Sequence, residues 1–413
     1  MTLSRRDLLA LAVAMPGFSW LARAPLPERG EGAIPCSPGP TDEPAWERIA
    51  SEFVIDGIHL NTGTVGASPL AVLQATIQHM RAFERMIGQE SVDVPALKRE
   101  LETFLGAWPG SIAILRNTTE AMSVAANGIA LEPGDEILST THEHIGGRCC
   151  WELLARRRGV VYRTFAPPLD PRNDDEVVKV WQANVTARTR VLSISHVLFS
   201  TGLLQPVGEL VQWARGRGII TVIDGAHPPG MLVNDLARVD ADFYATSTHK
   251  WLLGPKGTGL LVVRPDRMAT TWPLIGSGDW AAEDIRRFEH VGTSNDSLVA
   301  GLRAAVAFQQ AIGREAIERR VRSLATGLDA ALREIPRVRV FSPSRPSHRT
   351  AMVAFQLEGV SAEKLQGILG QARIRTRRIA ESGLEYLRLS THLYTLPRDL
   401  DRTLEILRTT ARG

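Results

Sequence analysis

Three short polar motifs each follow an apolar run of the length of a buried strand, so their side chains are candidates for chemistry at strand ends. The first is the segment RNTTE at 116–120, which follows the apolar residues 112–115 and starts a helical pattern. Free backbone amides at a helix start, together with the hydroxyls of Thr118 and Thr119, can bind a phosphate group. The alternative is a plain helix cap, which is a common role for threonine.

The second motif is VIDGAH at 222–227, in which Asp224 ends an apolar strand. A buried carboxylate is costly unless a cation or several hydrogen-bond donors accompany it. A protonated pyridine nitrogen is one such cation, and this ion pair makes pyridoxal phosphate an electron sink. The alternative is an aspartate that caps a helix or forms a turn.

The third motif is STHKW at 247–251, which follows the strand-like residues 243–246. A lysine beside a histidine and an aromatic side chain can have a lowered pKa and act as a nucleophile, which makes Lys250 a candidate for a Schiff base. The alternative is an exposed surface lysine, the commoner environment for this residue type.

These motifs lie within an alternating pattern of strands and helices that begins near residue 69. Strands are predicted over 112–115, 136–139, 160–165, 191–195, 219–223, 243–246 and 259–263, with helical patterns such as 120–130, 147–158 and 207–217 between most of them. This spacing predicts a mainly parallel sheet with helices on both faces. Ligands of such sheets bind at the carboxyl ends of the strands, where all three motifs lie.

The last part of the chain has a different pattern. Long helices are predicted over 297–311 and 314–333, followed by strands over 338–341, 352–356 and 386–389 and helices over 361–371 and 397–410. We therefore predict an α/β protein with a large domain over 69–296 and a smaller α+β domain formed by 44–68 and 297–413.

Together the segments NTT at 117–119, DGAH at 224–227 and STHK at 247–250 resemble the class V aminotransferase family of fold-type I pyridoxal-phosphate enzymes. The resemblance extends from about Asn61 to Tyr394, nearly the whole chain. It implies the fold-type I architecture and pyridoxal 5′-phosphate as the cofactor.

The resemblance also assigns roles to single residues. Lys250 resembles the Schiff-base lysine that also moves the α-proton, Asp224 resembles the partner of the pyridine nitrogen, and His227 resembles the group near the phenolic oxygen. The implied phosphate ligands are Thr118, Thr119, Ser247 and His249.

His144, in the segment THEH at 141–144, is similar to the family residue that stacks a ring on the cofactor. The alternatives for His142 and His144 are a zinc pair, or a deaminase-like histidine-glutamate motif with Cys149 and Cys150. Adjacent cysteines lack the spacing of a metal-binding pair, so stacking is favoured.

Two later segments resemble the family as well. The segment EHVGTS at 289–294 resembles one that crosses to a second subunit and contacts the phosphate through Thr293, which implies a homodimer with shared active sites. Arg388 resembles the arginine that binds the substrate carboxylate through two hydrogen bonds, and we assign Asn61 to the substrate with it. The alternative for Arg388 is a surface arginine at a strand end.

Departures from the cysteine desulfurases narrow the expected reaction. No cysteine lies between Ile374 and Leu387, where those enzymes carry their nucleophile, and the segment SHVLFSTG at 195–202 lacks their asparagine beside the cofactor. That segment and His227 resemble the isopenicillin N epimerase branch, although this branch often has a tyrosine where this chain has His144.

We therefore expect a reaction at the α-carbon of an amino acid or an amino-acid-containing metabolite, by transamination or epimerisation. A β-lyase or an oxidase on the same fold is the alternative. A binding protein that kept the fold and lost the cofactor is the alternative from a different class.

The N-terminal residues have the features of an export signal. The segment SRRDLL at 4–9 is a twin-arginine pattern, an apolar stretch and a small-residue cleavage site follow, and residues 1–24 are predicted to be a signal peptide. Residues 25–43 contain many prolines and predict a flexible mature N-terminus. The apolar stretch is too short for a stable membrane anchor. We expect the twin-arginine machinery, which carries folded and cofactor-loaded proteins, to place the chain in the periplasm or outside the cell.

Charge and cysteine content say less about function. The chain has 48 Lys+Arg and 45 Asp+Glu, a formal net charge of +3, which argues against nucleic acid as the main partner. Three cysteines are too few for a disulfide framework. The alternation of Arg373, Arg375 and Arg377 predicts a strand with one basic face, a candidate anion site.

Overall fold

The computed structural model describes residues 34–87, 91–289 and 291–413. The predicted signal peptide and the first part of the predicted flexible segment lie outside the described residues. Within the described ranges, no helix combines the length and the apolar character needed to cross a membrane.

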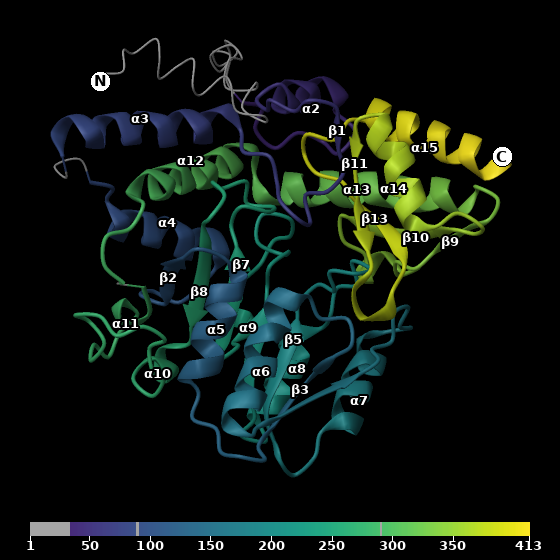
Figure 1. Ribbon diagram of the computed structural model, residues 1–413. Coiled ribbons are helices and arrows are strands. Elements are labelled where there is room, and N and C mark those ends of the chain that lie inside the picture. The colour runs from purple at the N-terminus through teal and green to yellow at the C-terminus, as the bar shows by residue number, and fades with distance from the viewer. Residues whose placement is uncertain (1–33, 88–90, 290) are drawn as a thin grey trace, which may run out of the picture. The chain divides into compact units, whose positions relative to one another are not determined.

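A seven-stranded sheet with the order β2-β8-β7-β6-β5-β3-β4 forms the centre of the large domain (Figure 1). Strand β8 runs antiparallel to both of its neighbours, β2 and β7, and the other neighbouring strands of this sheet are parallel to each other. The predicted mainly parallel α/β fold is thereby confirmed. The strands are β2 (Ile112–Leu115), β3 (Glu136–Thr140), β4 (Val161–Phe165), β5 (Thr189–Ser195), β6 (Ile220–Asp224), β7 (Phe243–Ser247) and β8 (Gly259–Val263).

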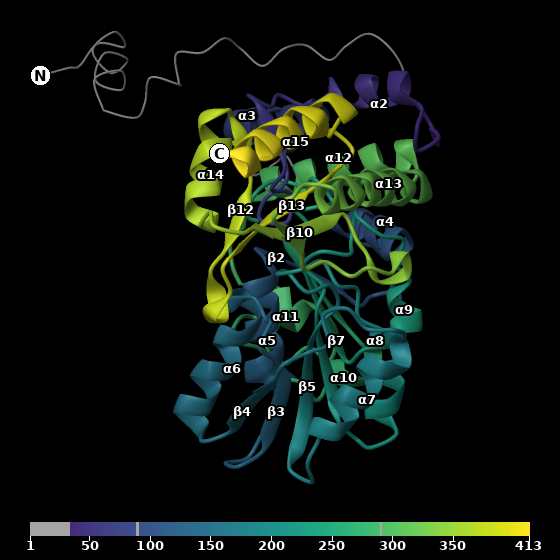
Figure 2. The ribbon, with the colours of Figure 1, turned by 90° about the vertical axis from the view of Figure 1, so that its right-hand side faces the viewer.

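Helices cover both faces of this sheet because successive strand residues point to opposite sides. Figure 2 shows α5 (Thr118–Gly128) and α6 (Ile145–Arg158) on one face, and α7 (Asp174–Asn184) and α8 (Val207–Arg215) on the other. One apolar core includes Leu138, Leu192 and Ile223 with α4 (Val94–Leu105), α7 and α8. The second core includes their strand neighbours Ile137, Val191 and Val222 with α5 and α6. The alternation therefore determines which side chains at the strand ends share a face.

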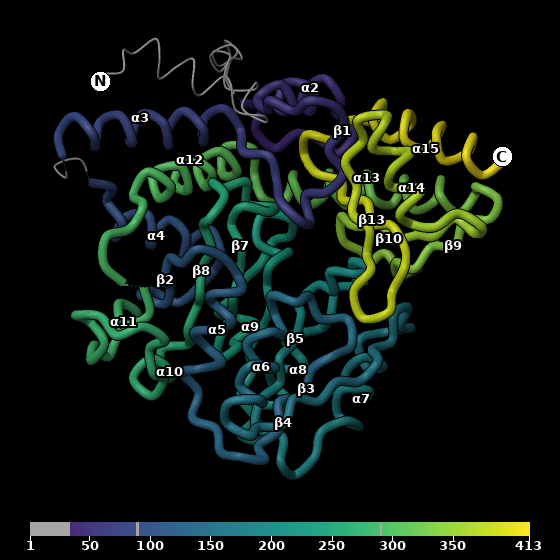
Figure 3. Tube along the Cα trace, viewed as in Figure 1, coloured from purple at the N-terminus to yellow at the C-terminus, as the bar shows by residue number. Residues whose placement is uncertain are grey.

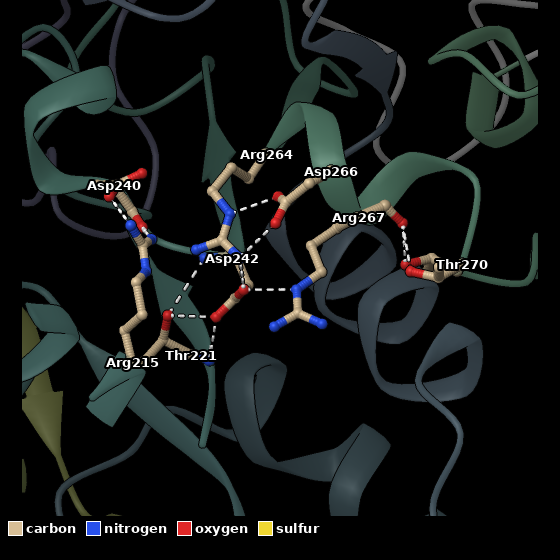
Figure 4. Close-up of polar contacts among 9 residues, drawn as sticks. Arg215, Thr221, Asp240, Asp242, Arg264, Asp266, Arg267 and Thr270 are labelled. Carbon is tan, nitrogen blue, oxygen red and sulfur yellow. Dashed lines mark hydrogen bonds and ion pairs between the residues drawn. The ribbon is translucent and has the colours of Figure 1, made fainter. Parts of the chain in front are cut away.

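An ionic cluster stabilises the end of the sheet that lies away from the carboxyl ends of β6 and β7 (Figure 4). Asp242, directly before β7, accepts hydrogen bonds from the backbone and hydroxyl of Thr221 at 2.8 and 2.9 Å. The guanidinium groups of Arg264 and Arg267 lie 2.8 and 2.6 Å from the same carboxylate. Arg267 belongs to α10 (Pro265–Met268), so the cluster ties this helix to the sheet.

The C-terminal part of the chain forms a second, smaller domain. An antiparallel sheet of order β12-β13-β10-β9 packs on α13 (Arg314–Arg333), α14 (Ala362–Gln371) and α15 (Pro397–Arg412) around an apolar core. The strands are β9 (Val338–Val340), β10 (Met352–Leu357), β12 (Arg377–Ile379) and β13 (Tyr386–Ser390). The short strand β1 (Ile58–His59) pairs with β11 (Ile374–Arg375) beside this sheet.

Helix α3 (Leu70–Met86) lies along α12 (Asp296–Ile312), as Figure 3 shows. The helices approach closely because Gly301 lacks a side chain: a Cβ there would lie 2.2 Å from Oγ1 of Thr76. The remaining short helices are α9 (Leu236–Val239), α11 (Arg286–Glu289) and the 3₁₀ turns η2 (Pro346–His348) and η3 (Glu381–Gly383).

The described part of the predicted flexible segment, residues 34–43, is bound to the small domain. The buried guanidinium of Arg320 donates to the carbonyl of Pro40 at 2.8 Å and pairs with Glu43, the first residue of α2 (Glu43–Ala50). The backbone N–H of Ser37 donates to the carbonyl of Ile312 at 2.7 Å. The composition of this stretch did not indicate these tertiary contacts.

The prediction of one basic-faced strand over 373–377 is wrong. Arg375 ends β11 in the two-stranded sheet, whereas Arg377 starts β12 in the four-stranded sheet. Arg373 has a φ of 60° and forms an ion pair with Asp56. The break occurs because tertiary pairing with two different sheets overrides the local alternation. Of the arginines in this run, Arg377 reaches the site described next.

Candidate active site

A cavity of about 360 Å³ lies at the carboxyl ends of β5, β6 and β7 and extends to the small domain. Nine of the eleven predicted site residues line it, although their positions span the chain from 118 to 388. The cavity is lined by Gly63, Thr64, Asn117, Thr118, Thr119, His144, Gly146, Ser195, Val197, Phe199, Asp224, Ala226, His227, Ser247, His249, Lys250, Arg377 and Arg388.

The first residues of α5 form one end of the cavity. Asn117 caps the helix by accepting the N–H of Glu120 at 3.0 Å, so the helix axis starts at the cavity. The backbone N–H of Thr118 donates to Oγ of Ser247 at 3.0 Å, and the two hydroxyls lie 2.7 Å apart. Gly259 permits this arrangement, because a Cβ there would lie 2.6 Å from Cα of Asn117. A helix start with several hydroxyl groups suits a phosphate.

His249 lies at the same end of the cavity, with Nδ1 3.1 Å from the carbonyl oxygen of Thr258. A carbonyl oxygen only accepts, so Nδ1 carries the proton and donates it. Burial, followed by the charge of Lys250, lowers the pKa of His249 to about 4. A dianionic phosphate nearby would act in the opposite direction and favour the charged imidazolium.

Asp224 is the last residue of β6, and its side chain is 6% exposed. Within the described residues it accepts a single hydrogen bond, from the N–H of Ala226 at 3.0 Å. Gly147 leaves room for this carboxylate, because a Cβ there would lie 2.6 Å from its Oδ2. Burial raises the pKa of Asp224, and the charge of Lys250 partly offsets this. A cation placed against the open carboxylate oxygen would stabilise its ionised form.

His227 faces the cavity with a defined tautomer. The indole N–H of Trp251 donates to Nδ1 of His227 at 3.0 Å, which leaves the ring proton on Nε2. Burial lowers the pKa of His227 well below its ordinary value. The imidazole is therefore neutral and can offer a hydrogen-bond donor to an oxygen in the cavity.

Lys250 follows β7 and comes close to Gly66, where a Cβ would lie 2.0 Å from its carbonyl oxygen. Burial lowers the pKa of Lys250 to about 8, and the charges of Arg388 and Arg377 contribute in the same direction. Asp224 opposes this shift. A fraction of the amine is therefore uncharged near neutral pH, as a nucleophilic lysine requires.

His144 caps α6 and lies between the sheet and Phe199. Its Nδ1 accepts the backbone N–H of Gly146 at 3.1 Å, and its ring meets that of Phe199 edge to face at 5.2 Å. Burial lowers the pKa of His144 to about 3, so the ring is neutral. A neutral, fixed imidazole in the cavity wall can stack on a planar ligand, and Phe199 is a neighbour that the sequence did not single out.

Arg388 lies on β13 at the small-domain side of the cavity and is 1% exposed. Its Nη1 donates to the carbonyl of Phe199 at 2.5 Å, and its Nη2 lies 3.4 Å from Oδ1 of Asn61 and 3.5 Å from Oγ1 of Thr64. Nε is buried without a hydrogen-bond partner in the described structure. Gly63 permits this approach, because a Cβ there would lie 2.6 Å from Nη2. A buried guanidinium without an acidic partner can bind a carboxylate through charge-assisted hydrogen bonds.

Two predicted site residues do not line the cavity. Asn61 lies behind the lining residues Arg388 and Thr64, whose side chains both contact its Oδ1, and Thr293 is exposed. The contact of Thr293 with a second subunit stays a prediction. His142 also lies apart from the cavity lining, with Nδ1 2.7 Å from Oγ of Ser200.

The donor set fits a phosphorylated pyridoxal. The helix start of α5 suits the phosphate, the open carboxylate of Asp224 suits a protonated ring nitrogen, and Nε2–H of His227 suits the ring oxygen. Lys250 supplies the amine that would bind the aldehyde carbon.

Comparison with known proteins identifies the family. The model of the family described as "Aminotransferase class-V" matches residues 76–385. The chain belongs to the class V aminotransferase family. Its relatives include isopenicillin N epimerase of Streptomyces clavuligerus, 34% identical over 88% of this chain and 97% of the relative. The isopenicillin N epimerase of Amycolatopsis lactamdurans is 32% identical over 88% and 98% of the two chains. A probable cysteine desulfurase of Xylella fastidiosa is 30% identical over 81% and 86%.

Solved structures of the same fold agree with this assignment. A C-DES mutant with glycine covalently linked to the PLP-cofactor has a TM-score of 0.78 and 26% identity, covering 86% of this chain and 96% of that chain. The cysteine desulfurase CsdA of Escherichia coli has a TM-score of 0.79 at 23% identity. The class V chain therefore has the fold-type I architecture, and its cofactor is pyridoxal 5′-phosphate.

Proposed function

We propose that this class V enzyme removes the α-proton of an amino acid or an amino-acid-containing metabolite, with epimerisation or transamination as the outcome. The observation that carries the proposal is the pair formed by Lys250 and Arg388 in one cavity. Lys250 is an amine with a lowered pKa, and Arg388 is a buried guanidinium without an ion pair in the described structure. One group can bind the substrate carboxylate while the other moves a proton at the adjacent carbon.

Each residue has a defined part in this scheme. Arg388 binds and orients the carboxylate, and Asn61 and Thr64 lie beside its Nη2. Lys250 would hold the cofactor through its amine, and its Nζ would be the group that accepts the α-proton of the substrate. When bound, pyridoxal phosphate withdraws electrons from the α-carbon. His144 and Phe199, whose rings contact each other, form part of the cavity wall.

The epimerase relatives support epimerisation as the first reaction to test. Two of them match this chain over nearly their whole lengths, at 34% and 32% identity. The direct test is incubation of the loaded enzyme with L- and D-amino acids in deuterated water. We expect deuterium at the α-carbon and loss of optical purity. Transamination would instead give a keto acid and an aminated cofactor. The absence of both α-exchange and keto acid across a panel that includes small peptides would contradict the proposal.

A second candidate is β-elimination from a sulfur-containing amino acid, because relatives include probable cysteine desulfurases and a matching structure is described as a cystine C-S lyase. The positions of the cysteines disfavour a mechanism in which an enzyme cysteine accepts the sulfur as a persulfide. Cys36 is exposed, Cys150 is buried, and none of the three cysteines lines the cavity. Burial also raises the pKa of Cys150, which keeps its thiol protonated. Release of sulfide from cysteine, or of cysteine persulfide from cystine, by the loaded enzyme would select this candidate.

We also propose the homodimer that the resemblance implies. Apolar side chains are exposed on α3 and over 272–291, where Trp272 is 61%, Trp280 is 51% and Val291 is 49% exposed. Large exposed apolar groups favour an interface. Sedimentation should give twice the chain mass. If Thr293 contributes to the active site of the partner subunit, a mixed dimer of one Lys250→Ala chain and one Thr293→Asp chain should have one intact site. Both substitutions then fall in the same site, and the other site keeps both native residues.

We also propose twin-arginine export from the sequence alone, because residues 1–33 lie outside the described structure. The proposal depends on the twin-arginine pattern at Arg5 and Arg6. Replacement of both arginines by lysine should retain the enzyme in the cytoplasm, whereas export of the doubly substituted chain would contradict the proposal.

A further inference from the structure

Glu143 is a buried carboxylic acid directly before His144, and the scheme above gives it no part. Its side chain is 2% exposed. Oε2 lies at hydrogen-bond distance, 2.5 Å, from Oγ of Ser195, and Oε1 accepts a hydrogen bond from Oγ1 of Thr140 at 2.9 Å. Both side-chain partners are neutral hydroxyl groups, the backbone of Ser195 also forms a hydrogen bond with Glu143, and no ion pair of Glu143 occurs in the described part of the chain.

Ser195 connects Glu143 with Asp224. Ser195 and Asp224 are register partners at the ends of the neighbouring strands β5 and β6. Ser193 and Val222 point to the face of the sheet that α5 and α6 cover. Side chains two positions apart on a strand point to the same face, so Ser195 and Asp224 also point to it. Both also line the cavity. The hydroxyl that Glu143 contacts therefore lies next to the carboxylate that faces the cofactor ring.

The surroundings of Glu143 favour its neutral form. Burial raises the pKa of Glu143 to about 7, and the negative charge of Asp224 on β6 adds to the shift. The other titratable group that faces it is Tyr162 on β4, and burial raises the pKa of Tyr162 as well. Asp224 has the charge of Lys250 to stabilise its anion, whereas Glu143 has only neutral partners, the hydroxyls on β3 and β5 and the backbone of Ser195, in the described structure. Of two neighbouring buried carboxyl groups, Glu143 is the one that retains a proton.

We propose that Glu143 is a positioning residue that holds a proton up to neutral pH, where it fixes the Ser195 hydroxyl and leaves Asp224 as the single ionised carboxylate facing the cofactor ring. This rests on the proposed function, because it concerns the same site. A protonated Glu143 donates its O–H to Oγ of Ser195, and the Ser195 hydroxyl then turns its own hydrogen toward the cavity. An ionised Glu143 would accept that hydrogen and place a second negative charge near Asp224. Asp224 would then hold a proton more readily and pair less well with the ring nitrogen.

The first test uses the cofactor-free protein and is independent of its reaction. Infrared difference spectra between pH 5 and pH 9 report the carbonyl stretch of protonated carboxyl groups. We expect a band that disappears as the pH rises through about 7 and that is absent from Glu143→Gln at every pH. Asp242→Asn, a buried carboxylate at the opposite end of the sheet, should leave this band unchanged. A band identical in wild type and Glu143→Gln would overturn the proposal.

The second test measures the dissociation constant of pyridoxal phosphate at pH 6.5. Glutamine keeps the neutral form and can donate an N–H to Ser195, so Glu143→Gln should bind within about twofold of wild type, whereas Asp224→Asn should bind at least about tenfold more weakly. A loss of tenfold or more in a folded Glu143→Gln, with unchanged circular dichroism, would mean that an ionised Glu143 is required. If wild type itself failed to bind, the proposed function would be wrong, and the infrared titration would still decide whether Glu143 holds a proton.

Discussion

Arg377 and Arg388 lie directly opposite each other on the antiparallel strands β12 and β13, and both side chains line the cavity. Like charges in such a pair destabilise a sheet unless an anion lies near them. Glu381 forms an ion pair with Arg377, while the contacts of Arg388 in the described structure are with neutral groups. The pair therefore has one unmatched positive charge, and a substrate carboxylate would supply the missing partner.

Arg388→Gln should raise KM for the substrate by about 100-fold or more, because it removes a buried, charge-assisted hydrogen-bond donor. Cofactor binding should stay near that of wild type, since Arg388 lies on the side of the cavity away from the start of α5. Arg378→Gln is the matched control: it lies on the neighbouring strand β12, but its ion pairs are with Glu385 and Glu363 outside the cavity. Steady-state kinetics with an unchanged KM in Arg388→Gln would argue against the carboxylate site.

Gly147→Ala should weaken cofactor binding by about tenfold or more, since the new Cβ would lie 2.6 Å from Oδ2 of Asp224 and displace that carboxylate. Gly327→Ala is the control, because it makes the same substitution at an exposed position of α13. No atom lies within 4 Å of a Cβ at that position. The control should gain about 0.5–1 kcal/mol in stability and keep its cofactor. Equal cofactor affinity of both variants, measured by equilibrium dialysis, would contradict the role of Gly147.

The rate at which cofactor-free protein binds pyridoxal phosphate covalently should rise with pH. The uncharged amine of Lys250 is the reactive form, and burial lowers its pKa to about 8. Below that value the rate should fall about tenfold per pH unit, and above it the rate should level off. Asp224 raises the pKa of Lys250, so Asp224→Asn should move the midpoint to lower pH. Stopped-flow absorbance measures both; a midpoint near 10 in wild type would contradict a buried amine.

Asp242→Asn should lower the free energy of unfolding by about 3 kcal/mol, because it leaves the charges of Arg264 and Arg267 without their buried partner. Asp242 precedes β7, whereas the cavity lies at the carboxyl ends of β6 and β7, so the dissociation constant of the cofactor should not change. Denaturant titration and cofactor binding separate the two effects. A cofactor affinity that fell together with stability would show that the two ends of the sheet are coupled.

Local patterns were sufficient to predict the sheet and the strand-end motifs. The strands 112–115 and 259–263 and the helix 314–333 were predicted with the bounds that the structure has. The reason is that buried strands have short apolar runs and the polar residues after them face a common edge. Sequence reasoning noted Trp251 as a neighbour of Lys250 and Glu143 within a histidine-glutamate motif, but it did not find their contacts with His227 and Ser195, which come from distant segments. It also misjudged Arg373–Arg377, because pairing with two different sheets leaves no signal in the alternation.

The central claim is that Lys250 holds pyridoxal phosphate in this cavity. The most direct measurement is the absorption spectrum of purified wild type and Lys250→Ala, before and after borohydride, with peptide mapping of the reduced protein. We predict a yellow wild type in which borohydride fixes the cofactor on the peptide containing Lys250, and a variant in which no peptide is labelled. A wild type that stays colourless with added pyridoxal phosphate, or a label on another lysine, would contradict the account.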